Sequence, residues 1–223
     1  MSAQGKKIGV VLAGCGYLDG AEIHEATLTL LALDRLGAEV VVMAPNKEQA
    51  HVVDHQKSEP VEGATARNVF DESARISRGN LHELGSVKAE DLDALILPGG
   101  FGAAKNLCDF AFKGADMTVD ETLSSLIQNM HGAGKPLGFI CIAPAIAAKV
   151  LGEAKPKLTI GNDPDTAAAL NSFGAEHVDC PVDEIVVDDR LKVVSTPAYM
   201  LGPSIAPVAK GIDKLVEKVA SYL

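Results

Sequence analysis

Short apolar runs alternate along the chain with longer stretches in which apolar residues recur every three or four positions. Residues 7–12, 39–43 and 92–97 have the length and β-branched content of buried strands. Residues 20–36 and 118–131 have helical spacing. Strands that alternate with helices in this way are typical of right-handed βαβ units around a parallel sheet. We therefore expect an α/β fold with helices on both faces of a mostly parallel sheet.

The alternation continues in the second half of the chain. Asp163 followed by Pro164 has the pattern of a helix N-cap and first helical position. The spacing predicts strands at 135–140, 157–160, 177–182, 184–187 and 192–195, and helices at 143–151, 163–173 and 204–223.

Residues 46–91 are the least regular part of the sequence. They are polar and rich in His, Arg and Gly, with a helix predicted at 67–76. Because 223 residues suit one large domain better than two, we expect a single domain over 1–223, with 46–91 as an excursion from the sheet.

Composition limits the classes of partner. Hydrophobic residues make up 47% and charged residues 22% of the chain, which indicates a globular protein. The absence of Trp predicts a core of Val, Ile, Leu and Ala. A net charge of −10 disfavours nucleic acid or an anionic membrane as partner.

The four cysteines Cys15, Cys108, Cys141 and Cys180 are widely spaced and form no C-x-x-C pair. No apolar run is long enough to span a bilayer, and the first residues do not have the pattern of a secretory signal. These features favour a reducing cytoplasm.

Three predicted strands end in segments that can carry chemistry: AGCGYLDGAEIHEA, LPGGFGAAKNL and GFICIAPA. In open α/β sheets, ligands bind beyond the carboxyl ends of the strands. In the third segment, Cys141 lies at a sharp turn from strand to helix, where helix-opening amides lower a thiol's pKa. We therefore expect a thiolate populated near neutrality, and the alternative is a buried structural cysteine.

The other two segments offer backbone donors and carboxyls. Gly99 and Gly100 let the backbone approach a ligand and can contribute to an oxyanion hole, or they belong to an ordinary glycine-rich loop. Glu22 and Glu25 lie three apart on one helix face. A desolvated carboxyl near the thiol can transfer a proton, whereas the alternative is a surface residue that compensates the helix dipole.

Other patterns are weaker. Gly14, Gly16 and Gly20 do not match a dinucleotide fingerprint, because the third glycine falls one place late. His51 and His55 have helical ligand spacing but lack an evident third ligand, so we expect no metal. For Cys15 and Cys180, which are predicted near the same sheet edge, we expect apolar packing.

Taken together, the motifs resemble those of a known family. The segments LPGGFGAAKNL and GKPLGFICIAPA resemble the glycine turn and the cysteine elbow of the PfpI-like superfamily, which is related to class I glutamine amidotransferases and includes the parkinsonism-associated deglycase. With GCGYLDGAEIHEATLTLLA and TPAYML, they more closely resemble the ElbB-type "enhancing lycopene biosynthesis" subgroup, whose name describes a pathway effect. The resemblance covers about residues 6–201.

This resemblance implies a flavodoxin-like sandwich, a homodimer, Cys141 as nucleophile and Glu25 as its carboxyl partner, with Glu22 as the alternative. The family's oxyanion donors correspond to the amides of Gly100 and Ile142. The chain departs from the family at three points: Ile142 replaces a histidine after the cysteine, no His–Glu pair is present at 195–199, and no histidine is present at 161–162.

Glutaminase and peptidase chemistry both need a base that takes the proton of the cysteine and then gives a proton to the amine leaving group. The missing histidines therefore disfavour both reactions. We therefore expect a glyoxalase III-like activity on small dicarbonyls such as glyoxal, without glutathione, metal or other cofactor. The alternative hypothesis is a redox-sensing or partner-binding protein in which Cys141 is oxidised and catalysis is residual.

Overall fold

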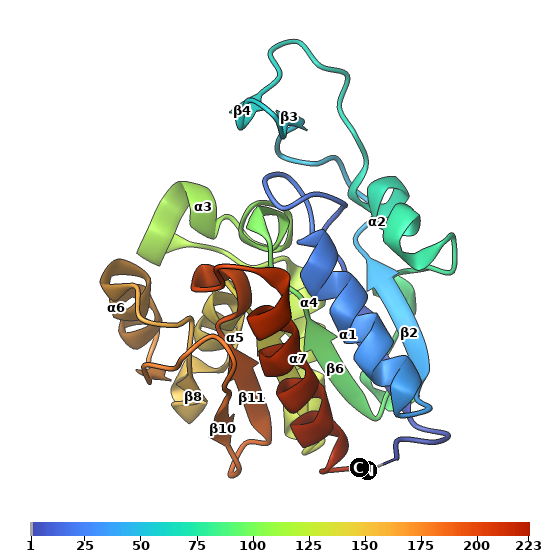
Figure 1. The fold of residues 1–223 in the computed structure, drawn as a ribbon, viewed down its shortest axis with the longest axis vertical. Coiled ribbons are helices and arrows are strands. Elements are labelled where there is room, and N and C mark those ends of the chain that lie inside the picture. The colour runs from blue at the N-terminus through green and yellow to red at the C-terminus, as the bar shows by residue number, and fades with distance from the viewer. Residues whose placement is uncertain (1) are drawn as a thin grey trace.

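The computed structural model describes residues 2–223. Among them, seven strands form the main sheet in the order β10-β11-β7-β6-β1-β2-β5 (Figure 1). All neighbours pair in parallel except β10 and β11. The strands are β1 (Lys7–Val11), β2 (Glu39–Ala44), β5 (His82–Glu83), β6 (Ala94–Leu97), β7 (Leu137–Ile140), β10 (Val186–Asp188) and β11 (Val193–Thr196).

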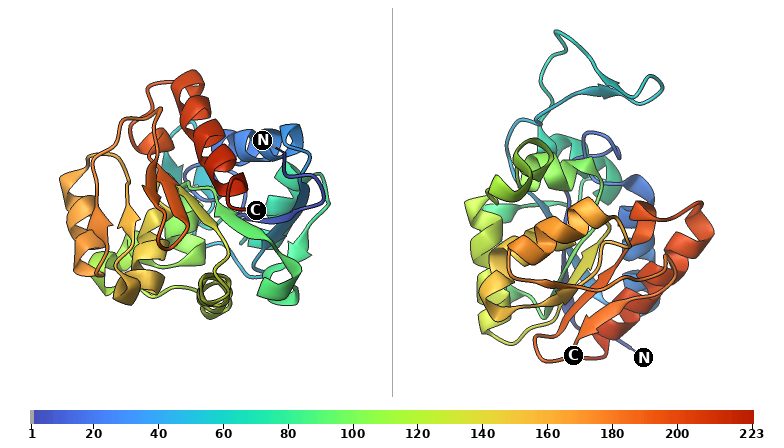
Figure 2. Two further views of the ribbon diagram at one scale, coloured as in Figure 1. Left: turned by 90° about the horizontal axis from the view of Figure 1, so that it is seen from below. Right: turned by 90° about the vertical axis from the view of Figure 1, so that its left-hand side faces the viewer.

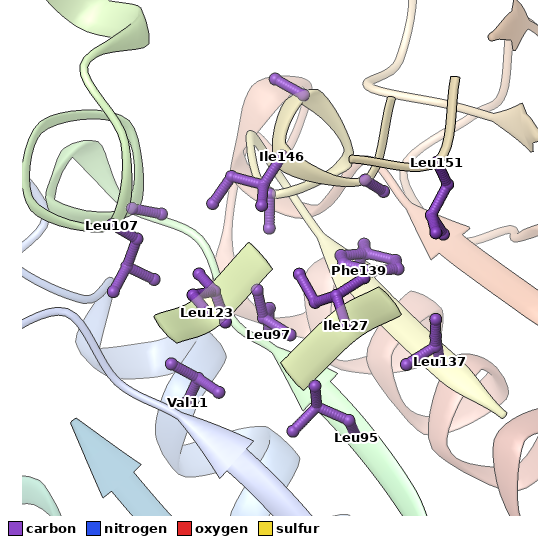
Figure 3. Packing of buried hydrophobic residues seen from close by; sticks show 14 of the residues in the cluster. Val11, Leu95, Leu97, Leu107, Leu123, Ile127, Leu137, Phe139, Ile146 and Leu151 are labelled. Carbon is purple, nitrogen blue, oxygen red and sulfur yellow. The ribbon is translucent and has the colours of Figure 1, made fainter. Parts of the chain in front are cut away.

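Helices cover both faces of this sheet, which confirms the expected α/β sandwich. Helices α1 (Ile23–Arg35) and α7 (Ile205–Ala220) lie side by side on one face, and α4 (Glu121–Gly132) and α5 (Pro144–Leu151) lie on the other (Figure 1). Because successive strand side chains point to opposite faces, Val10 and Val11 of β1 belong to different cores. In the core beneath α4, Phe139 packs with Leu95, Leu97 and Ile127 (Figure 3).

Both cores share one sheet, and on this basis we propose that the chain forms a single domain.

Shorter elements surround the sheet. The short helices are α2 (Val69–Ser77), α3 (Phe110–Lys113) and α6 (Pro164–Ser172), with a π-helix at Ala103–Leu107. Two small strand pairs are β3 (Val53–Asp54) with β4 (Glu59–Pro60) and β8 (Lys157–Leu158) with β9 (Glu176–His177), and 3-10 turns lie at Leu84–Ser86, Ala89–Asp91, Gly114–Asp116, Gly152–Ala154 and Ala198–Met200. The β3–β4 pair projects away from the body (Figures 1 and 2).

Three expectations need correction. The first helix begins at Ile23 rather than residue 20, because Glu22 is its N-cap. The predicted strand at 177–182 is wrong: only Glu176–His177 pairs, with β8, and Pro181 has no N–H to continue a ladder. The segment 46–91 is not wholly outside the sheet, because β5 pairs with β2 at the edge.

A further observation concerns membranes. Among residues 2–223, no helix is long and apolar enough to cross a bilayer.

Candidate active site

The three chemistry-bearing segments meet at one edge of the sheet. Strands β7, β6 and β1 are parallel neighbours, so their carboxyl ends lie together, as expected for ligand sites in open α/β sheets. The backbone N–H of Glu22 donates to the carbonyl of Gly99 at 3.0 Å, and that of Gly102 donates to the carbonyl of Gly20 at 2.8 Å. These bonds join the start of α1 to the glycine turn after β6.

Cys141 follows β7 in a left-handed backbone conformation. Its φ is 63°, and α5 begins at Pro144. A non-glycine residue with positive φ is uncommon and is often found at functional sites. The backbone is held there because the N–H of Cys141 donates to the carbonyl of Thr196 at 2.9 Å. The turn therefore presents the side chain of Cys141 to the edge of the sheet.

Gly99 leaves the space that the thiol needs. A methyl group at Gly99 would lie 2.5 Å from the Cβ of Cys141 and 2.9 Å from Oε2 of Glu25, far closer than non-bonded atoms approach. The glycine is therefore required for the carboxyl and the cysteine to lie together.

Glu25, and not Glu22, is the carboxyl beside the sulfur. Its side chain is completely buried and hydrogen-bonded to Cys141. Oε2 accepts the N–H of Gly99 at 2.9 Å, and Oε1 accepts the N–H of Tyr199 at 3.2 Å. Glu22 instead accepts the N–H of Glu25 at 2.7 Å as the N-cap of α1. The two glutamates thus share a helix turn but hold different positions.

Burial makes this pair retain its protons. Burial raises the pKa of Glu25 to about 8, and the negative charge of Glu22 adds to the effect, against the N–H donors of Tyr199 and Gly99. Burial also raises the pKa of the Cys141 thiol, and the charge of Glu25 raises it further. The expectation of a thiol ionised near neutrality is therefore wrong, because desolvation outweighs the amides that open the helix.

Backbone donors nevertheless face the sulfur. The N–H groups of Gly100 and Ile142 hydrogen-bond to Cys141 and lower its pKa against the effect of burial. The N–H of Gly99 is occupied by Glu25, so of the predicted glycine pair only Gly100 has its amide at the sulfur. Gly100 has a φ of 91°, which only glycine adopts readily.

A pocket of about 510 Å³ opens above the sulfur of Cys141. Glu22 and Thr166 supply its polar side chains, and the rings of Tyr17 and Tyr199 line it as well. The remaining wall is apolar and consists of Phe101, Ala104, Phe110, Ala111, Ile142 and Met200. A hollow of similar volume beside α4 and α5 includes Gln128 and Lys149 but no cysteine or shifted acid, so we place the chemistry at Cys141.

Two residues of this neighbourhood were missed from the sequence. The Tyr199 hydroxyl lies 2.7 Å from Nδ1 of His24, and burial, with the negative charges of Glu22 and Glu25, raises the pKa of the phenol. The segment TPAYML entered the sequence analysis only through the family resemblance, and His24 had no motif of its own. Nothing in the local pattern links two residues that are 175 positions apart.

The other candidates lie outside the pocket. All four cysteines are free; burial raises the pKa of Cys15 and raises that of Cys180 to about 11. His55 lies 3.6 Å from Asp19, and the ring of His51 packs edge-on against Phe112. Within residues 2–223, no group of three or more His, Cys, Asp or Glu side chains is arranged to hold a metal ion.

Comparison with known proteins shows the family of this chain. Residues 10–200 match the model of the DJ-1/PfpI family. The chain belongs to the DJ-1/PfpI family. The expected PfpI-like resemblance is thereby confirmed, and this superfamily includes cysteine-dependent enzymes.

Curated relatives extend over most of the chain. The human "Glutamine amidotransferase-like class 1 domain-containing protein 3, mitochondrial" is 45% identical and aligns with 96% of this chain and 82% of its own length. The zebrafish "ES1 protein, mitochondrial" is 36% identical, with 86% and 76% covered.

Solved structures show the same fold. The Ehrlichia chaffeensis "isoprenoid biosynthesis protein with amidotransferase-like domain" is 38% identical, covers 97% of this chain and 100% of its own, and superposes with a TM-score of 0.89. The Francisella tularensis Rapid Encystment Protein, at 14% identity and a TM-score of 0.63 over 96% of this chain and 99% of its own, shares the fold.

Proposed function

We propose that the protein is a glutathione-independent glyoxalase that converts small dicarbonyls to 2-hydroxy acids. The observation that supports this best is the pairing of Cys141, which lines the pocket, with the fully buried carboxyl of Glu25 beside it, and with the amides of Gly100 and Ile142 directed at Cys141. A thiol can add to an aldehyde, and a carboxyl with a pKa of about 8 can both accept and donate a proton near neutrality.

In the first step, ionised Glu25 takes the proton of the Cys141 thiol as the sulfur adds to the aldehyde carbon. The oxygen that becomes negative lies near the amides of Gly100 and Ile142. Glu25 then gives this proton to that oxygen, which produces a neutral hemithioacetal and restores the carboxylate.

In the second step, Glu25 takes the hydrogen of the former aldehyde carbon as a proton and returns it to the neighbouring carbon through an enediol. In the same step, the hydroxyl proton on the oxygen of the first carbon passes to the oxygen of the neighbouring carbon. The first carbon is oxidised to a thioester as the second is reduced to an alcohol, so no outside oxidant or reductant is needed. Water then cleaves the thioester and releases the 2-hydroxy acid and the free thiol.

Amide hydrolysis is supported less well. Glutaminase and peptidase chemistry require a base that passes a proton to a departing amine. No histidine lines the pocket among the described residues, and the residue after the cysteine is Ile142. An aldehyde expels no leaving group, which suits a site whose acid–base group is the single carboxyl of Glu25.

The test is glyoxal consumption with 2-hydroxy acid formation, compared in wild type, Cys141→Ser and Cys180→Ser. Cys180 is buried and lies outside the pocket, so its replacement controls for the loss of a thiol. We expect Cys141→Ser to lose more than about 1,000-fold in kcat and Cys180→Ser to retain activity. Undiminished turnover by Cys141→Ser refutes the mechanism.

The redox-sensing alternative is supported less well by this site. Oxidation proceeds through the thiolate, and burial together with Glu25 raises the pKa of Cys141. Intact-mass analysis after peroxide titration, set beside the glyoxal turnover number, separates the two functions. A rate far below about 1 s⁻¹, slow for an enzyme, combined with rapid oxidation of Cys141, favours the sensor.

Location and assembly are part of the proposal. We propose a reducing compartment, the cytoplasm, for a chain with four free cysteines, although the human and zebrafish relatives are named mitochondrial. We also propose a homodimer, on the family resemblance. The name of the Ehrlichia protein refers to isoprenoid biosynthesis. Nothing in the described site suggests chemistry on isoprenoids.

A further inference from the structure

The pocket above Cys141 is larger than glyoxal requires. Glyoxal has four non-hydrogen atoms and occupies about 120 Å³, if each atom takes roughly the share of one water molecule in the liquid, about 30 Å³. The pocket holds about 510 Å³, which is within the usual range for sites that take drug-sized ligands. A glyoxal bonded to the sulfur would leave most of this space filled by water.

Much of the wall of the remaining space is hydrocarbon. Phe101 and Phe110 face it together with Ile142 and Met200. Phe101 is 50% exposed. Exposed apolar surface is unfavourable in water, so an apolar group that covers the ring gains free energy by removing this surface from solvent. Phe101 is held in place because its N–H donates to the carbonyl of Tyr17 at 2.7 Å, so the ring belongs to a fixed turn.

The pocket offers no cationic partner for an anionic substituent. Its one acidic side chain is Glu22, and no Lys, Arg or His lines it among the described residues. The nearby Lys105 is not among the lining residues: its Nζ donates to the carbonyl of Leu18 at 2.8 Å and lies 5.3 Å from the centre of the Phe101 ring. A phosphate or carboxylate on the substrate would therefore find only hydroxyl groups as side-chain donors, beside the carboxyl of Glu22 and apolar carbon.

We infer that the preferred substrates are 2-oxoaldehydes with an uncharged hydrocarbon substituent, of the size of a butyl or phenyl group, that lies against Phe101, Phe110 and Met200. This inference rests on the proposed glyoxalase activity for the reaction and adds the substrate class. The aldehyde carbon is at the sulfur of Cys141, and the substituent extends from the ketone carbon into the apolar part of the pocket.

The first experiment measures kcat/KM for 2-oxoaldehydes that carry hydrogen, methyl, n-butyl or phenyl on the ketone carbon. We expect kcat/KM to rise at least about tenfold from hydrogen to butyl, since one methylene in a hydrophobic pocket is worth about 10- to 200-fold. A carboxylate at the end of the butyl chain should cancel the gain. Equal or falling kcat/KM along the series overturns the inference and leaves the proposed activity intact.

Phe101→Ala and Phe112→Ala form a matched pair of variants. The two rings are similarly exposed, at 50% and 53%, but only Phe101 lines the pocket, while Phe112 packs on His51. We expect Phe101→Ala to reduce the butyl-to-hydrogen preference about tenfold, and Phe112→Ala to leave it unchanged. An unchanged preference in Phe101→Ala contradicts the placement of the substituent.

A second measurement does not depend on turnover. Benzyl alcohol and 1-hexanol cannot form a hemithioacetal, and we expect them to shift the methyl NMR signals of Ile142 and Met200 while the core residue Ile8 stays unchanged. Ethanol at the same concentration should give smaller shifts. Absence of shifts overturns the apolar site. If no dicarbonyl is consumed but the shifts occur, the proposed reaction fails and the apolar binding site stands.

Discussion

Replacing Glu25 by Gln tests whether a buried, protonated carboxyl makes stability depend on pH. The pKa of Glu25 rises from its ordinary 4.5 to about 8 in the folded protein. This difference of about 3.5 corresponds to about 5 kcal/mol, at 1.36 kcal/mol per pKa unit. The side chain is fully buried, so solvent screening does not reduce the effect.

The sign follows from where the proton is held. Between pH 4.5 and 8, folded Glu25 keeps a proton that the unfolded chain has released, so folding binds a proton. The contribution to the free energy of unfolding is complete below pH 4.5, falls as the pH rises and is lost above about pH 8. Gln is neutral at every pH and therefore does not show this loss.

The variant also loses a hydrogen-bond acceptor. Both carboxyl oxygens of Glu25 accept N–H groups, from Gly99 and Tyr199, whereas the amide of Gln has one oxygen. One N–H then faces an NH₂ group, at a cost of about 1–3 kcal/mol. We expect Glu25→Gln to be less stable than wild type at pH 5 and more stable at pH 8.5, with a total swing of about 4 kcal/mol.

Urea unfolding followed by far-UV circular dichroism at half-unit steps from pH 5 to 8.5 measures this swing, because the chain has no Trp to report by fluorescence. The control is Glu39→Gln, which removes one negative charge from an exposed side chain that lies 3.6 Å from Nζ of Lys7, and it reports the effect of losing one surface charge with its exposed ion pair. ¹³C NMR of labelled Glu carboxyls gives the pKa of Glu25 directly. A stability difference that stays constant within about 1 kcal/mol refutes a protonated Glu25 near neutrality.

Three further predictions follow from the same geometry. With a pKa of about 8 for Glu25, kcat/KM for a dicarbonyl should rise about tenfold per pH unit below pH 8 and level off above it; a profile flat from pH 6 to 9 would exclude Glu25 as the base. Gly99→Ala places a methyl 2.5 Å from the Cβ of Cys141 and should lower kcat at least about 100-fold in steady-state assays, with unfolding by circular dichroism as the check that the protein still folds. Phe139→Ala removes a fully buried ring from the core beneath α4 and should cost about 3–5 kcal/mol in urea unfolding; a loss under about 1 kcal/mol would show that the core repacks.

Much of the central fold was predictable because its strands are buried on both faces and read as continuous apolar runs. Predicted residues 7–12, 39–43 and 92–97 correspond to β1, β2 and β6 within a few residues. Short edge elements were not predictable in the same way. Strand β5 has two residues, His82 and Glu83, which are polar and exposed, so only its pairing with β2 identifies it as a strand.

The candidate site was predictable in its members but not in its electrostatics. Cys141, Glu25, Gly100 and Ile142 follow from the turn chemistry and the family resemblance, and the structure brings them together. The local pattern also predicted a low thiol pKa, because a helix start favours a thiolate. That prediction failed because burial depends on which distant segments cover the sulfur.

By itself, the sequence determined the order of the central strands and the main helices, the turn at Cys141 and the short list of groups that can react, because backbone preference and hydrophobic period are local properties. Only the tertiary structure decided that Glu25 lies beside the thiol while Glu22 caps the helix, that Tyr199 and His24 meet across 175 positions, and that the pocket is lined by phenyl rings. Desolvation, hydrogen-bond partners and pocket shape arise from residues far apart in the chain, so they exist only once the sheet has assembled.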